Sequence, residues 1–82
     1  MDRVRAKISL DTTKSVLDFV QLMTREDLED RLMLENFNGS HRVSAKSFLG
    51  AMYASTEWGG EIYLINETND GVFPSFINDF RV

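Results

Sequence analysis

Residues 43–52 decide the fold, and they read Val43-Ser44-Ala45-Lys46-Ser47-Phe48-Leu49-Gly50-Ala51-Met52. Small polar residues stand here in front of apolar residues at helical spacing, which predicts the start of a helix of about two turns. Either Ser44 or Ser47 can supply the hydroxyl oxygen that caps the free amides of the first turn.

The chain before this stretch predicts a β-hairpin. Leu32 and Leu34 alternate with their neighbours, as expected for a strand. Asn38-Gly39 is a strong hairpin signal, because both residues tolerate a positive φ. A short returning strand is expected at residues 41–43, directly before the predicted helix.

The N-terminal part of the chain predicts a strand followed by a helix. Apolar residues alternate with basic and polar ones over residues 3–10, which indicates a half-buried strand. Residues 11–13 offer side-chain oxygens that can cap a helix, and the helix is expected to fade at residues 24–27. Its apolar stripe is expected to consist of Val16, Leu17, Phe19, Val20 and Met23.

The C-terminal part predicts a fourth strand and a third helix. Gly59-Gly60 interrupts the chain before the predicted strand at residues 61–65, in which Ile62 and Leu64 share one face. Pro74 fits the first turn of a helix, whose apolar stripe would be Phe73, Phe76, Ile77 and Phe80. The order β-α-β-β-α-β-α predicts an α+β open-faced β-sandwich with a four-stranded, mainly antiparallel sheet. Three helices are expected on one face, and the other face is expected to be solvated.

Composition restricts the class of protein. A chain of 82 residues allows one domain, residues 1–82, and 43% hydrophobic residues are enough for a globular core. The lack of cysteine excludes disulfides and thiolate zinc sites. No apolar run approaches the roughly 18 residues of a membrane span, so a cytoplasmic protein without membrane contact is expected. The net charge of −4 argues against direct nucleic-acid binding, and Arg3, Arg5 and Lys7 are expected on the solvent side of a strand.

The chain resembles HPr, a small protein of the bacterial sugar phosphotransferase system. Residues 43–52 are similar to the regulatory serine and second helix of that family. Residues 60–65 resemble its fourth strand, and Phe19-Val20 resembles the end of its first helix. The resemblance implies an HPr-like fold, a bacterial cytoplasmic protein, no cofactor, and protein partners of the phosphotransferase system or of catabolite regulation.

The departure from the family lies at the phosphocarrier site. HPr carries its phosphohistidine at the start of the first helix, where this chain reads Thr12-Thr13-Lys14-Ser15. Imidazole is nucleophilic at neutral pH and its phosphoramidate remains reactive, whereas a threonine hydroxyl is a poor unassisted nucleophile. Thr12 and Lys14 are therefore interpreted as a degenerate site, with Lys14 as a point charge in place of the family's arginine. No nucleophile–base pair, phosphate loop or metal-binding set appears, so the chain is not expected to be an enzyme.

The single histidine, His41, is expected to be a solvated imidazole at the end of a strand, with a relocated phosphocarrier as the alternative. One histidine with scattered carboxylates does not predict a metal site. The acidic run at residues 26–30 lacks the alternation and the glycine of a calcium loop and is interpreted as a solvated connection.

The second helix carries the remaining candidate site. In many Gram-positive bacteria the family's corresponding serine is phosphorylated by HPr kinase, and the product binds a transcriptional repressor. Ser47 is thus either a helix cap alone or also a phosphorylation site. Phe48, Leu49 and Met52 match the family's partner-binding positions. Such spacing is usually that of core residues, but the resemblance implies that Phe48 and Met52 face outward.

The favoured hypothesis is a non-catalytic regulatory or docking protein that acts through its second helix, with a phosphorylation switch at Ser47. In lacking the histidine while keeping the serine, it is similar to the catabolite-repression paralogue of HPr. One alternative is a phosphocarrier whose acceptor is Thr12, Thr13 or His41. Another is a diverged HPr-like domain that serves an unrelated complex.

Overall fold

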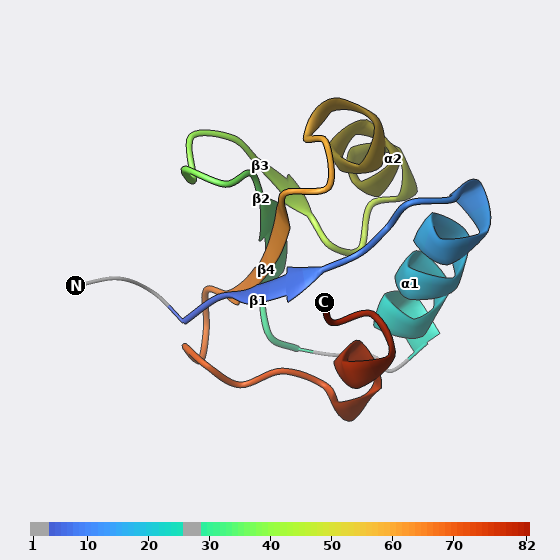
Figure 1. Ribbon diagram of the computed structural model, residues 1–82. Helices are drawn as coiled ribbons and strands as arrows, with labels where there is room; N and C mark the ends of the chain where they lie inside the picture. Colours follow the sequence, from blue (N-terminus) through green and yellow to red (C-terminus); the bar gives the residue numbers. More distant parts are fainter. Residues whose placement is uncertain (1–3, 26–28) are drawn as a thin grey trace.

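The fold is one antiparallel sheet with helices on one of its sides, as a computed structural model describes it for residues 4–25 and 29–82. The strands β1, β4, β2 and β3 follow one another across a four-stranded sheet, all in antiparallel pairs. Figure 1 shows both α-helices on the same side of this sheet. The predicted α+β class and open-faced sheet are confirmed. The elements are β1 (Ala6–Ile8), α1 (Thr13–Arg25), β2 (Leu32–Glu35), β3 (Arg42–Ser44), α2 (Phe48–Glu57), β4 (Ile62–Asn66) and the 3₁₀-helix η1 (Ser75–Asp79).

Three parts of the sequence predictions lie outside the described residues. They are Arg3 of the basic cluster, the last part of the predicted end of the first helix, and residues 26–28 of the acidic run.

The prediction of a third α-helix is wrong. The described residues contain two α-helices, and the C-terminal segment forms the short 3₁₀-helix η1. Pro74 precedes η1 with φ −61° and ψ 147°, so it is an extended residue before the helix and not part of its first turn. Ile77 is buried as expected. The other residues of the expected stripe are only partly buried against the core: Phe73, Phe76 and Phe80.

The C-terminal backbone explains why η1 stays short. The amide of Ser9 donates to the carbonyl of Phe80 at 2.8 Å, and the amide of Val82 donates to the carbonyl of Lys7 at 3.1 Å. The chain must therefore run alongside β1 directly after η1. Because these hydrogen bonds begin at Phe80, directly after η1, the helix cannot continue beyond this point.

The boundaries of three strands differ from the predicted ones. β3 begins at Arg42 because the amide of His41 closes the hairpin on the side chain of Asn36, at 3.2 Å. β4 extends to Asn66, which pairs with Leu32 across the sheet. β1 is shorter than the predicted strand over residues 3–10 and covers Ala6–Ile8.

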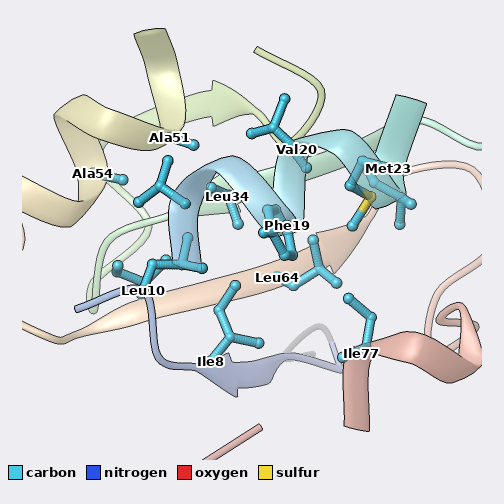
Figure 2. Packing of buried hydrophobic residues seen from close by; sticks show 14 of the residues in the cluster. Ile8, Leu10, Phe19, Val20, Met23, Leu34, Ala51, Ala54, Leu64 and Ile77 are labelled. Carbon is cyan, nitrogen blue, oxygen red and sulfur yellow. The ribbon is translucent and has the colours of Figure 1, made fainter. Parts of the chain in front are cut away.

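The main core lies between the sheet and the α-helices (Figure 2). α1 buries the predicted residues Val16, Phe19, Val20 and Met23. Leu17, predicted to widen this stripe, is 43% exposed, because it projects about 100° away from Val16 around the helix. The sheet residues that face the helices include Ala6, Ile8, Leu32, Leu34, Ile62 and Leu64.

α2 approaches the sheet through small residues. Ala51 and Ala54 are fully buried, and Figure 2 shows both on the inner side of the helix. A Cβ atom at Gly50 would lie 2.9 Å from the Cβ atom of Val43 on β3, closer than carbon atoms pack. The backbone of α2 therefore lies against the sheet at Gly50, which only a residue without a side chain allows.

The other face of the sheet was predicted to be solvated. Arginine side chains lie on this face. The side chain of Glu35 points to this face but is only 6% exposed. Its carboxylate lies 2.8 Å from Nε of Arg5 and 3.2 Å from Nε of Arg42. The guanidinium of Arg5 also stacks 3.9 Å from the ring centre of Tyr63. Ile65 is buried on this face as well, so the face is polar at its surface without being fully wetted.

The close approach at Gly50 gives a first prediction. We expect Gly50→Ala to lower the free energy of unfolding by about 1–3 kcal/mol, because the new methyl group would overpack against Val43. This loss should outweigh the gain of about 1 kcal/mol in helix propensity. Urea unfolding measures the difference. Thr56→Ala, at an exposed position of α2, is the matched control and should change stability by less than about 0.5 kcal/mol. A Gly50→Ala protein as stable as the original chain would contradict this packing.

Candidate functional site

The start of α1 is closed by a reciprocal pair of hydroxyl side chains. The amide of Ser15 donates to Oγ1 of Thr12 at 3.0 Å, and the amide of Thr12 donates to Oγ of Ser15 at 3.1 Å. This is a capping box in which serine replaces the usual glutamate or glutamine. Thr12 is thus the cap among the candidates at residues 11–13. Its side-chain oxygen accepts a hydrogen bond from the first turn of α1.

Lys14 interacts along α1. Its Nζ atom lies 2.9 Å from the carboxylate of Asp18, one turn further on, and its side chain is 85% exposed. The hydrogen bond to Asp18, together with the negative charge of that carboxylate, raises the pKa of Lys14. The ammonium group therefore stays charged and is engaged with Asp18, away from the cap at Thr12.

His41 lies far from the start of α1. It ends the turn between β2 and β3, and β3 is the edge strand opposite β1 in the sheet. Figure 1 shows this hairpin and α1 on opposite sides of the molecule. His41 is exposed, as the sequence predicted. The fold does not bring His41 and Thr12 into one site.

Ser47 caps α2. Its Oγ accepts a hydrogen bond from the amide of Gly50 at 3.1 Å, and its backbone is extended, with φ −96° and ψ 118°. Ser44 instead accepts a bond from the amide of Lys46 at 3.2 Å, inside the turn between β3 and α2. Of the two predicted cap candidates, Ser47 is the helix cap and Ser44 stabilises the turn before it.

The outer side of α2 carries large apolar side chains. Leu49 is 80% exposed, Tyr53 47% and Phe48 39%, whereas Met52 is partly buried and packs against the core. We refer to these four residues, Phe48, Leu49, Met52 and Tyr53, as the α2 outer surface. The outward position of Phe48 agrees with the resemblance, and Met52 is less exposed than the resemblance implied. Leu49 is the most exposed of the set.

Tyr53, like Leu49, is a residue of α2 whose orientation the sequence did not settle. Its spacing of four residues from Leu49 puts the two side chains on the same side of the helix. The ring of Tyr53 packs edge-on against Trp58 at the end of α2, with the ring centres 6.1 Å apart. This contact holds Tyr53 at the surface and in a defined orientation.

The two candidate regions are separate but lie on neighbouring helices. α1 and α2 pack against each other, and the hydroxyl of Ser55 in α2 donates to the carbonyl of Leu10, just before α1. Leu17 of α1 is another exposed apolar side chain on these two helices. The caps at Thr12 and Ser47 both serve helix starts, so each hydroxyl already accepts a backbone hydrogen bond.

Residues 4–25 and 29–82 contain neither a candidate metal site nor a candidate membrane-spanning helix. Within these residues, no group of three or more histidine, aspartate or glutamate side chains lies close enough to hold a metal ion. No helix of the described chain combines the length and the apolar character needed to cross a membrane.

Comparisons with known proteins identify no relative: no family model, no curated protein and no solved structure matches this chain.

The caps give a second prediction. Ser47→Ala should lower the free energy of unfolding by about 1 kcal/mol, because the amide of Gly50 loses its acceptor. Ser47→Asp should be close to the original chain in stability, since aspartate is an equally good cap and its charge suits a helix start. Thermal unfolding of both variants measures the effect, with Ser44→Ala as the control for the preceding turn. Equal stability of the alanine and aspartate variants at position 47 would show that the cap contributes nothing.

Proposed function

We propose that this chain is a non-catalytic, HPr-like docking protein that binds partners through the α2 outer surface, with a phosphorylation switch at Ser47. The observation that carries the proposal is the exposure of Phe48 and Leu49 directly behind the capping serine. The expected partners are proteins of the phosphotransferase system or of catabolite regulation, namely HPr kinase and a transcriptional regulator.

The distribution of side chains on α2 supports a docking role. Small residues such as Ala51 and Ala54 face the core, while the larger Leu49 faces solvent. Covering a leucine side chain contributes about 1.5–3 kcal/mol, so the exposed Leu49 represents binding energy that folding does not use. Aromatic side chains held at a surface often anchor an interface, and Tyr53 and Phe48 are of this kind. Clustered exposed apolar residues mark an interaction site.

The position of Ser47 supports the switch. A phosphate on its hydroxyl would add about two negative charges beside the free amides at the start of α2, where the helix dipole favours them. The next residue along the chain is Phe48, a member of the α2 outer surface. A charge at Ser47 would therefore alter the edge of the docking surface without changing the core.

Some features of the chain support the resemblance to HPr, and others depart from it. The element order β-α-β-β-α-β and residues 43–52 agree with the family resemblance. The short η1 in place of a third helix departs from it, as does the capping threonine at position 12. The proposal therefore depends on the α2 outer surface and not on the phosphocarrier end.

A phosphocarrier with Thr12, Thr13 or His41 as acceptor has less support. The hydroxyl of Thr12 is occupied as a helix cap, and His41 lies on an exposed hairpin away from the helices. Incubation with the phosphoenolpyruvate-dependent donor enzyme tests this alternative. An acid-labile phosphate on the chain would support it, and an unlabelled chain would exclude it.

The third prediction concerns the switch. HPr kinase with ATP should add one phosphate to the chain and none to a Ser47→Ala variant, as measured by intact-protein mass spectrometry. Ser44→Ala is the matched control and should still be phosphorylated. If the chain takes up no phosphate, or if Ser47→Ala takes up as much, the switch is wrong.

The fourth prediction concerns docking. The protein is immobilised and incubated with an extract of its native host, and the proteins that it retains are identified by mass spectrometry. We expect the original chain to retain specific partners. Leu49→Glu should lose them, because a charge then occupies the centre of the α2 outer surface. Phe37→Ser changes another exposed apolar residue, which is 64% exposed on the β2–β3 hairpin, and this variant should retain them. Partners that bind Leu49→Glu as well as the original chain would place the interface elsewhere. If these partners have no connection with sugar transport or catabolite regulation, the alternative of an unrelated complex is favoured.

A further inference from the structure

The turn between β2 and β3 contains an asparagine followed by a glycine, Asn38-Gly39. Asn38 is exposed to solvent, and Gly39 has a φ of 74°, a conformation that glycine adopts without strain. Every other asparagine of the chain precedes a residue with a side chain: Asn36, Asn66, Asn69 and Asn78. The peptide nitrogen after Asn38 is therefore less hindered than the nitrogen after any other asparagine.

The side chain of Asn38 folds back over the peptide group that follows it. Its Oδ1 atom accepts a hydrogen bond from the amide of Ser40 at 3.0 Å, two residues further on. In such an Asx turn the side-chain carbonyl lies beside the next peptide group and not in free solvent. The Ser40 amide also polarises this carbonyl, as a donor to a developing oxyanion does. The side-chain amide carbon of Asn38 is thus held beside Gly39 and made more electrophilic.

We propose that Asn38 is a site of spontaneous covalent modification, in which the backbone nitrogen of Gly39 attacks Cγ of Asn38. The nitrogen gives its proton to hydroxide or water and forms a bond to Cγ. The bond from Cγ to Nδ2 breaks, and ammonia leaves. Water then opens the five-membered succinimide ring at either of its two carbonyl carbons. The product at position 38 is aspartate or isoaspartate, and the sum of the steps converts one amide and one water into one carboxylic acid and ammonia.

The folded turn restrains this reaction through a backbone hydrogen bond. The amide of Gly39 donates to the carbonyl of Asn36 at 3.1 Å, and this bond must open before the nitrogen can attack. The turn lies at the end of a hairpin whose second strand, β3, is an edge of the sheet. Exposed turns of this kind open locally at little cost in free energy, since water replaces the lost bond. The reaction therefore proceeds from the folded protein and does not require global unfolding.

Both products change the charge of the hairpin, and isoaspartate also changes its backbone. The new carboxylate lies next to Gly39, where a Cβ atom would be 3.6 Å from a carboxylate oxygen of the buried Glu35. Isoaspartate inserts a methylene group into the main chain before Gly39. This insertion displaces the amide of Gly39 from the carbonyl of Asn36. The modification thus loosens the end of the β2–β3 hairpin, away from the α2 outer surface.

Incubation at mildly alkaline pH, followed by peptide mapping with mass spectrometry, tests the proposal. The peptide that contains Asn38 should gain the mass difference between an amide and a carboxylic acid. Protein isoaspartyl methyltransferase should then methylate part of this product. We expect conversion at Asn38 to be at least about tenfold faster than at Asn69 or Asn78, because the following glycine leaves the attacking nitrogen unhindered.

Two variants separate succinimide formation from other routes. Asn38→Gln keeps the amide but would have to close a six-membered ring, so it should react at least about tenfold more slowly. Gly39→Ala hinders the nitrogen and should slow the conversion of Asn38, and circular dichroism verifies that each variant keeps the fold. Conversion of Asn38 no faster than that of Asn69 overturns the proposal. So does a product without isoaspartate, which would indicate direct hydrolysis of the side chain, or an Asn38→Gln variant that reacts as fast as the original chain.

Discussion

The close approach of α2 to the sheet at Gly50 is the constraint on which the rest of the structure depends. A Cβ atom at this position would meet Val43 at 2.9 Å, so the helix backbone lies directly on β3. With so little space beneath the helix, only small side chains such as Ala51 and Ala54 fit inside. The larger side chains of α2 are then forced outward. The exposed position of Leu49 follows from packing on the opposite side of the helix.

Charged side chains cover part of the sheet face that has no helices on it. Its helices cover one face, and a thin domain has no further layer to cover the other. Glu35 is buried on that other face between Arg5 and Arg42, and Arg42 continues to Glu67 at 2.8 Å. Removing one partner from such a network leaves a buried charge, which is costly. Ile65 is also buried on this face.

Side-chain hydroxyl groups cap the starts of α1 and α2. Thr12 and Ser47 stand at equivalent places, each accepting a hydrogen bond from an amide three residues further on. A hydroxyl at a helix start stabilises the helix and also presents an oxygen where a phosphate would be favoured.

The sequence by itself determined the strands, the first two helices and the inner stripe of α1. Periods of two and of about 3.6 residues are local signals, and Phe19 or Leu34 follow them directly. It also gave the two cap candidates of α2. Only the tertiary structure decided that Ser47 and not Ser44 is the cap, because that choice depends on where α2 begins against β3. Likewise, the pattern of Leu49 and Tyr53 fits a core stripe equally well. Their exposure depends on Gly50, because its close approach to Val43 determines which side of α2 faces the sheet. The length of η1 also depends on tertiary structure, since the backbone after it bonds back to the first strand region.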